Sequence, residues 1–145
     1  LDTRKTTPGV RLLEKWAVII GGGTNHRFGL YDMMMIKDNH IDFAGGIKQA
    51  IEKAVSYQES KGLSLKIEVE ARDLKEVEEI LAVGHIHRIM LDNFNPDRCK
   101  SVADELTEMG LREHVVLEAS GGILLENLKL WSLGSDLPIK YSDSP

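Results

Sequence analysis

The chain has 145 residues, of which 42% are hydrophobic and 28% charged, and its formal net charge at pH 7 is −5. This length suits one domain with its own core, and the composition is too polar for a membrane-spanning segment. An acidic chain without a basic stripe argues against nucleic acid as a partner, and a single cysteine excludes an intrachain disulfide. We therefore expect a cytoplasmic protein with no nucleic-acid or membrane partner.

The charges are unevenly distributed along the chain. Residues 1–40 contain six Lys or Arg against four Asp or Glu, a net charge of +2, so the remaining residues carry −7. Arg4 and Lys5 stand side by side in "DTRKTTPG". A guanidinium binds a carboxylate or phosphate through two parallel hydrogen bonds, and the adjacent ammonium adds a second charge. This favours a site for a small anion, the alternative being a solvated pair at a chain end.

Two strands are expected in the first third of the chain. The first is "WAVII" (residues 16–20), which three glycines follow, and the second is "GLYDMMMIKD" (residues 29–38). Glycines allow positive φ and let backbone N–H groups approach an anion, so the loop with His26 and Arg27 is a candidate anion site. The alternative is an ordinary glycine-rich turn. Lys37 ends the second strand, where its ammonium would lie at the rim of a sheet.

From residue 46 onward the hydrophobic period alternates between that of a helix and that of a strand. Asp73 and Asn95 stand at positions typical of helix caps, and Pro96 suits a first helical position. The pattern predicts helices over residues 46–62, 73–84 and 95–110 and from 123, and strands over 65–72, 88–92 and 114–120.

Repeated strand-helix units imply an α/β fold with parallel strands and right-handed crossovers. Either an α/β barrel or a doubly wound sheet would satisfy this pattern, and the periodicity does not choose between them. In both folds the functional residues lie at the carboxyl ends of the strands. The polar residues at those ends are therefore the candidates for a site.

Glu70 and Asp92 each end an expected strand. Paired carboxylates suit Mg²⁺, which takes one or two acids together with substrate phosphates and water. They could equally bind sugar hydroxyls or balance a positive charge, and Asp92 could instead cap a helix. A serine hydroxyl and the unhindered N–H groups of two glycines precede an expected helix. These groups could bind a phosphate, or the three residues could form an ordinary turn. These residues are Ser120, Gly121 and Gly122.

Three other features are expected to be structural. His85 and His87 have a spacing that can bind metal, but they follow a helix end without a third ligand nearby, which favours a polar loop. The three methionines at 33–35 are expected in the core, and Cys99 is expected to be a small packed residue on a helix.

Six motifs, in this order and spacing, resemble the catalytic domain of the quinolinate phosphoribosyltransferase family, also called carboxylating nicotinate-nucleotide pyrophosphorylases: "DTRKTTPG", "GGGTNHRFGLYD", "IKDNHI", "KIEVE", "RIMLDNF" and "LEASGGI". The resemblance implies a partial α/β barrel of the type II phosphoribosyltransferase kind that works as a homodimer or hexamer. It also implies that quinolinate and phosphoribosyl pyrophosphate react, with Mg²⁺, to nicotinate mononucleotide, pyrophosphate and CO₂ in de novo NAD biosynthesis.

The resemblance implies roles for the residues of the matching motifs. Glu70 and Asp92 would face the ribose and the metal, with Glu68 competing for the first of these positions. Lys5, Lys37, Glu70 and Asp92 are the expected catalytic residues. A phosphate would be seated by Ser120, Gly121 and Gly122. The two carboxylates of quinolinate and neighbouring phosphates would be held by Arg4, Lys5, His26, Arg27 and Lys37.

Two departures from the family pattern predict a fragment. The family has an N-terminal domain that contributes basic residues and covers a neighbouring subunit's site, and its chains continue through a pattern like "DVISVGALTHS", where this chain has "LWSLGSDLPIKYSDSP". We expect a catalytic domain over residues 1–130, truncated at both ends, and a divergent tail over 131–145. The alternatives are a related pyrophosphorylase with another substrate, or a non-catalytic remnant that binds polyanions or dimerises.

Overall fold

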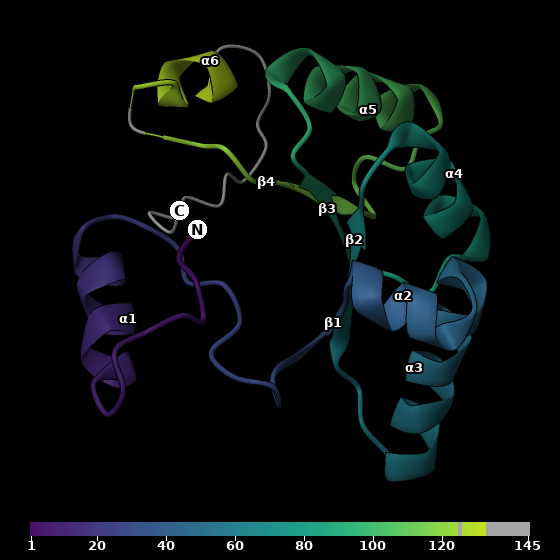
Figure 1. The fold of residues 1–145 in the computed structure, drawn as a ribbon, viewed down its shortest axis with the longest axis horizontal. Helices are drawn as coiled ribbons and strands as arrows, with labels where there is room; N and C mark the ends of the chain where they lie inside the picture. The colour runs from purple at the N-terminus through teal and green to yellow at the C-terminus, as the bar shows by residue number, and fades with distance from the viewer. Residues whose placement is uncertain (125, 133–145) are drawn as a thin grey trace.

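A computed structural model of the chain describes residues 1–124 and 126–132, which form an α/β fold with one four-stranded parallel sheet (Figure 1). The strands are β1 (Met33–Ile36), β2 (Lys66–Ala71), β3 (Arg88–Asp92) and β4 (Val116–Ser120). The helices of the described part are α1 (Arg11–Ile20), α2 (Asp38–Ala44), α3 (Ile47–Lys61), α4 (Leu74–Val83), α5 (Pro96–Glu108) and α6 (Leu128–Ser132). None of these helices has both the length and the apolar character needed to span a membrane.

The strand order decides between the two folds that the sequence left open. Neighbouring strands follow one another in the chain, in the order β1-β2-β3-β4. A doubly wound sheet reverses its strand order at a switch point, whereas a barrel adds each strand beside the last. The described strands do not close, so they form the expected partial barrel.

Local sequence signals set the helix boundaries in the second half of the chain. The Asp73 carboxylate accepts the Glu76 N–H at 2.9 Å at the start of α4, and the Asn95 side chain accepts the Arg98 N–H at 2.8 Å at the start of α5. Such caps bond backbone N–H groups that have no partner within the helix. The expected caps at both helices are confirmed.

The two faces of the sheet are covered by different parts of the chain. The helices α2–α5 lie on one side of the strands, and residues 1–32, including α1, lie on the other (Figure 1). On the helix side, apolar side chains that alternate along each strand form the main core, among them Ile67, Val69, Ile89, Leu91 and Leu117. The opposite face is also buried at mid-strand, because the N-terminal region covers it.

The strand expected at "WAVII" is wrong, because these residues form the second half of α1. The apolar side chains of Leu12, Trp16 and Ile20 recur every four residues and share one face of the helix, a spacing that a five-residue window does not reveal. All three side chains are more than half exposed, so this apolar face is uncovered in the chain as it stands.

The second expected strand is shorter than predicted. Only Met33–Ile36 pair with β2, because the Asp32 carboxylate accepts the N–H groups of Phe28 and Gly29, at 2.7 and 2.9 Å, and folds this segment into a turn. Carboxylates commonly compete with strand pairing in this way.

The helix expected from residue 123 begins instead at Leu128. The Asn127 side chain accepts the Leu124 N–H at 2.8 Å and donates to the Gly122 carbonyl at 2.9 Å, which holds a turn where the helix was predicted. Most of the expected divergent tail, residues 133–145, lies outside the described residues.

Candidate active site

The carboxyl ends of three strands bring polar side chains to one edge of the sheet. Glu70 pairs in register with Met90, and Asp92 lies two residues further along the same strand, so Glu70 and Asp92 share one face of the sheet. Asp92 pairs in turn with Ser120 on β4. All three polar residues are partly exposed. This is the arrangement that the strand-end reasoning predicted.

The loops after β3 and β4 cross closely at this edge. The Asn93 N–H donates to the Ser120 carbonyl at 2.8 Å, and a Cβ atom on Gly121, whose φ is +93°, would collide with Asn93. Glycine is therefore required at position 121 both by its backbone conformation and by the space. Asp92 accepts the Asn93 side-chain amide at 2.9 Å, while Asn95 caps α5, so Asp92 is not the helix cap.

No helix begins directly after the Ser120–Gly122 turn in the described chain, since α6 starts at Leu128. The expected support of a helix N-terminus for a phosphate there is wrong. The Ser120 hydroxyl and the backbone N–H groups of the turn remain a predicted phosphate-binding site, but without a helix N-terminus beside them.

The three glycines after α1 do not offer their N–H groups to an anion. Those of Gly21, Gly22 and Gly23 donate to carbonyl groups of α1, at 2.9, 3.0 and 2.8 Å. These glycines end a helix. The expected anion contact is wrong, because the preceding segment is helical and its last carbonyl groups accept the glycine N–H groups.

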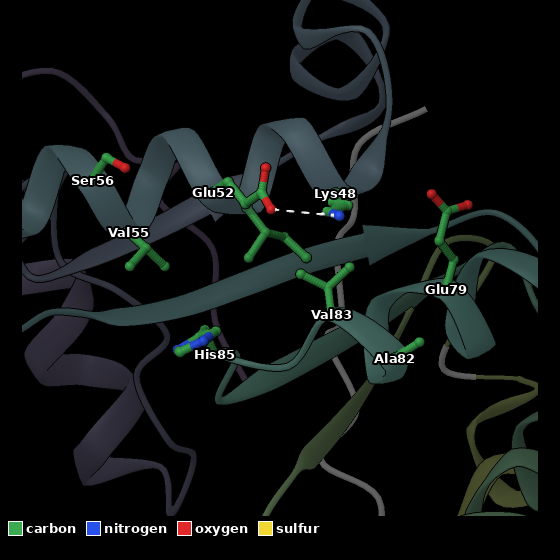
Figure 2. Close-up of a pocket in the computed structure, with 9 residues that line it drawn as sticks. Lys48, Glu52, Val55, Ser56, Glu79, Ala82, Val83 and His85 are labelled. Carbon is green, nitrogen blue, oxygen red and sulfur yellow. Dashed lines mark ion pairs between the residues drawn. The ribbon is translucent and has the colours of Figure 1, made fainter.

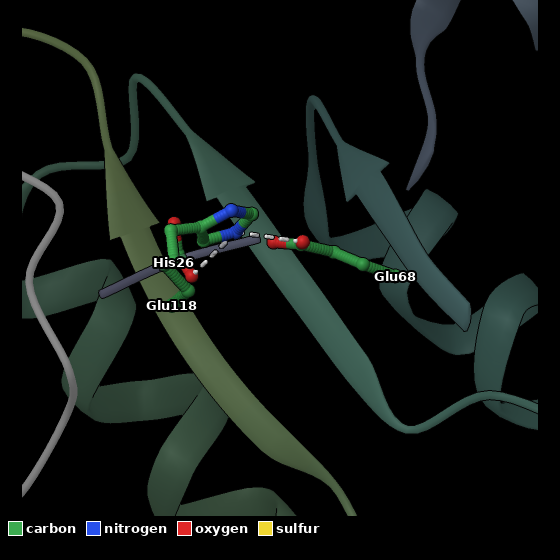
Figure 3. Close-up of side chains that lie close together, drawn as sticks. All are labelled: His26, Glu68 and Glu118. Carbon is green, nitrogen blue, oxygen red and sulfur yellow. Dashed lines mark ion pairs between the residues drawn. The ribbon is translucent and has the colours of Figure 1, made fainter. Parts of the chain in front are cut away.

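Two glutamates and a histidine meet on the covered face of the sheet (Figure 3). His26 Nε2 lies 2.9 Å from Glu68 Oε2 and 3.3 Å from Glu118 Oε2, and the Arg88 Nη1 donates to Glu118 Oε2 at 2.7 Å. The side chains of both glutamates are 0% exposed and that of His26 is 2% exposed. We call these four residues the buried charge cluster.

The buried charge cluster is electrically balanced when His26 is protonated. Burial alone would lower the pKa of His26, but hydrogen bonds to Glu118 and Glu68 and their negative charges outweigh it and raise the pKa above 6.5. His26, Glu68 and Glu118 are also the one group of three metal-binding side chains that the described residues bring together. The imidazolium and Arg88 already neutralise the two carboxylates, so we assign a proton rather than a metal to this position.

Arg27 extends over the same face of the sheet. Its Nη2 lies 3.4 Å from the Met35 sulfur, and Met35 pairs in register with Glu68. The buried Nε has no hydrogen-bond partner. Burial and the nearby charge of Arg4 lower the pKa of Arg27. Arg27 therefore carries a buried donor that has no partner among the described residues.

The remaining predicted cations are found at the surface. Lys5 and Lys37 are exposed, and Lys37 directly follows β1 at the sheet rim, as expected. The Thr7 hydroxyl and N–H both donate to the Glu14 carboxylate, which ties the segment with Arg4 and Lys5 to α1. The role predicted for each of these cations stays a prediction.

Sequence reasoning missed several residues around the site. Glu118 lies in β4 two residues before Ser120, as Glu68 lies two residues before Glu70, so the repeated spacing was a usable signal. A buried ion pair between Asp2 and Lys15 carries no such signal, because a lysine on a helix is ordinarily solvated.

The features expected to be structural are confirmed in large part: Met34 packs against the core, whereas Met35 lies partly exposed beside Arg27. Met33 is buried, Cys99 is packed in α5 with a pKa raised by burial to about 11, and His85 and His87 are exposed in the loop before β3.

A surface groove of about 570 Å³ lies between α3 and α4 (Figure 2). Its exposed charged residues include Lys48 and Glu52, which lie 3.8 Å apart and partly neutralise each other. Both helices pack on the apolar face of the sheet, opposite His26. The groove is therefore separate from the strand-end site.

Comparison with known proteins connects this site to a family. The family described as "Quinolinate phosphoribosyl transferase, C-terminal domain" matches residues 1–135. The chain is 46% identical over 138 residues to a chloroplastic carboxylating nicotinate-nucleotide pyrophosphorylase of Arabidopsis thaliana, covering 88% of this chain and 39% of that protein. A mitochondrial decarboxylating quinolinate phosphoribosyltransferase of Nicotiana glauca has the same identity and coverage.

Solved structures agree with the sequence comparison. The nicotinate-nucleotide pyrophosphorylase of Francisella tularensis superposes with a TM-score of 0.83 at 37% identity, covering 96% of this chain and 46% of that one. NadC from Streptococcus pyogenes gives a TM-score of 0.79 at 38% identity, covering 97% and 46%. The chain spans about two fifths of the length of the curated relatives it matches. It belongs to the quinolinate phosphoribosyltransferase family, as part of the C-terminal domain.

Proposed function

We propose that this chain forms the catalytic domain of an enzyme that transfers the phosphoribosyl group of phosphoribosyl pyrophosphate to quinolinate. The products are nicotinate mononucleotide, pyrophosphate and CO₂, in de novo NAD biosynthesis. The observation that carries the proposal is the guanidinium of Arg27, whose Nε is buried without a partner on the sheet face that also presents Glu70 and Asp92. A dianion and a ribose would then meet at one edge.

The cations would bind the charged groups of the substrates. We propose that Arg4 and Arg27 hold the carboxylates of quinolinate, because a guanidinium pairs with a carboxylate through two hydrogen bonds. Lys5 and Lys37, both exposed, would bind neighbouring phosphates. His26, whose Nε2 faces Glu68 and Glu118, would line the site next to Arg27 in the chain. Ser120, Gly121 and Gly122 would seat a phosphate.

The acids would stabilise charge that develops during the reaction. As the bond between the anomeric carbon and pyrophosphate breaks, positive charge grows on the ribose, which Glu70 and Asp92 would face. The pyridine nitrogen then bonds to that carbon. Loss of CO₂ leaves the electron pair of the broken bond on the ring carbon beside the positive nitrogen, and a proton replaces the carboxylate.

Glu70 and Asp92 also fit a magnesium ion, since they present carboxylate oxygens from adjacent strands on one face of the sheet. We propose that these two residues hold Mg²⁺ together with substrate phosphates. When bound, the ion would supply positive charge to the pyrophosphate leaving group.

We further propose a cytoplasmic homodimer or hexamer. The exposed apolar face of α1, with Leu12, Trp16 and Ile20, supports association. Sedimentation would give the assembly size, with a monomer contradicting the proposal. The two plant relatives named above are chloroplastic and mitochondrial, so fractionation of the source cells is needed to test the compartment.

Calorimetric titration with quinolinate and with phosphoribosyl pyrophosphate, each with Mg²⁺, tests the function, followed by chromatography for nicotinate mononucleotide. Arg27→Ala should weaken quinolinate binding by about tenfold or more, since a hydrogen bond to a charged group contributes about 1.5–3 kcal/mol. Arg98→Ala removes the same charge from the exposed surface of α5 and should leave the affinity unchanged.

The outcomes separate the alternatives. Binding of both substrates without product would favour a non-catalytic polyanion-binding protein. Binding of phosphoribosyl pyrophosphate alone would favour a related enzyme with another acceptor. Failure to bind either substrate would overturn the site.

A further inference from the structure

A buried ion pair joins the N-terminal segment to α1. Lys15 Nζ lies 2.8 Å from Asp2 Oδ1, and the two side chains are 2% and 9% exposed. Removing both charges from water is costly, so such a pair stabilises a fold only where good geometry and further hydrogen bonds compensate. The further bonds of this pair all lead to one loop.

Asp2 and Lys15 hold the backbone of residues 24–27. The Asp2 carboxylate accepts the His26 N–H at 2.7 Å, and the Asp2 N–H donates to the Thr24 carbonyl at 3.1 Å. Lys15 Nζ donates to the Arg27 carbonyl at 3.1 Å. The pair therefore holds the backbone of this loop at both of its ends, next to the two proposed binding residues His26 and Arg27.

The bonds of this pair lie close in the chain to Arg4 and Arg27. Arg4 lies two residues after Asp2, and its charge lowers the pKa of Arg27. A rigid connection beneath the loop would keep the Arg27 cation in place before a ligand arrives.

We propose that Asp2 and Lys15 are positioning residues that hold the loop carrying Arg27 in place for a dicarboxylate, without contacting the ligand. This inference rests on the proposed function for the identity of the ligand, quinolinate. The network that it describes, from α1 through the ion pair to residues 24–27, does not depend on that identity.

The test compares the double variant Asp2→Leu, Lys15→Met with the matched control Glu14→Gln. The double variant removes both charges together, so neither is left buried alone and the chain keeps its fold. Glu14 is the neighbour of Lys15 and also ties the N-terminal segment to α1, through Thr7, but has no bond to residues 24–27. Circular dichroism and thermal melting would verify that both variants are folded.

We expect the double variant to bind quinolinate at least about tenfold more weakly, and Glu14→Gln to bind it as the parent chain does. In an Arg27→Ala background the double variant should cause little further loss, since positioning acts through Arg27. An unchanged quinolinate affinity in the folded double variant would overturn the proposal, as would a full additional loss in the Arg27→Ala background.

Hydrogen exchange of the His26 amide separates failure of this inference from failure of the function. Asp2→Ala removes the acceptor of that amide and should speed its exchange at least tenfold, while Glu14→Gln should not. If the parent chain binds no quinolinate, the proposed function fails, and exchange alone decides whether the pair holds the loop. Unchanged exchange in Asp2→Ala would refute the anchoring itself.

Discussion

The two faces of the sheet are both buried at mid-strand but are stabilised by different physics. Val69 and Glu68 are neighbours in β2, and both are 0% exposed. Val69 packs in the apolar core beneath the helices, where burial is favourable in itself. Glu68 faces residues 1–32, and His26 balances the negative charge of its buried carboxylate. The helix face therefore tolerates conservative changes of side-chain shape. On the opposite face, which we call the site face, every buried charge must keep its partner.

Breaking the buried charge cluster should have the largest effect. Glu118→Gln leaves Arg88 and His26 with one carboxylate between them, and removing one partner from a buried ion pair costs roughly 3–5 kcal/mol. Urea unfolding at pH 7 measures the loss. Leu117→Ala, one residue earlier and on the opposite face, is the matched control, with an expected cost of about 2–5 kcal/mol from cavity formation.

The two variants differ in how their cost depends on pH. The loss in Leu117→Ala should be the same at pH 6 and pH 8, because no titrating group is involved. In Glu118→Gln the loss should shrink as the pH rises through the pKa of His26 and the imidazolium loses its proton. An equal response to pH in both variants would contradict the distinction between the faces.

A smaller effect is expected from pH alone. The pKa of His26 is raised in the folded chain above its ordinary value of 6.5, so its stabilisation is complete below about pH 6.5 and is lost as the pH rises through the folded pKa. The free energy of unfolding should fall over that interval, and NMR titration of the His26 ring should show the matching transition. His26→Gln should abolish this pH dependence, and its persistence in that variant would assign it to another group.

The smallest effect concerns the helix face. Cys99 is 1% exposed, and burial raises the pKa of its thiol to about 11. Since the thiolate is the reactive form, the folded chain should react slowly with a disulfide reagent at pH 8, and urea should accelerate the reaction. Rapid labelling of the folded chain would show that the packing around α5 opens.

Much of the helix face could be predicted from the sequence because its signals are local. The spacing of apolar residues and the caps at Asp73 and Asn95 define α4 and α5 within a single turn of chain. The positions of Glu70 and Asp92 at strand ends followed from the same pattern once the strands were parallel and adjacent.

The site face was harder to predict because its partners are distant in the chain. Glu118 and His26 are in contact although 92 positions separate them in the sequence. Asp2 pairs with Lys15 of α1, a helix whose second half the sequence pattern predicted as a strand. A buried charge looks like a solvated one until its partner is known. The charged half of the site therefore depended on tertiary structure, while its strand-end half did not.

The buried charge cluster has a consequence for the evolution of the sequence. It ties a loop and three strands together through His26, Glu68, Arg88 and Glu118. A substitution at any one of these positions leaves an uncompensated charge, so a second substitution nearby must accompany it. Among natural homologues these four positions should vary jointly, and a lineage that lost one charge should have lost an opposite one.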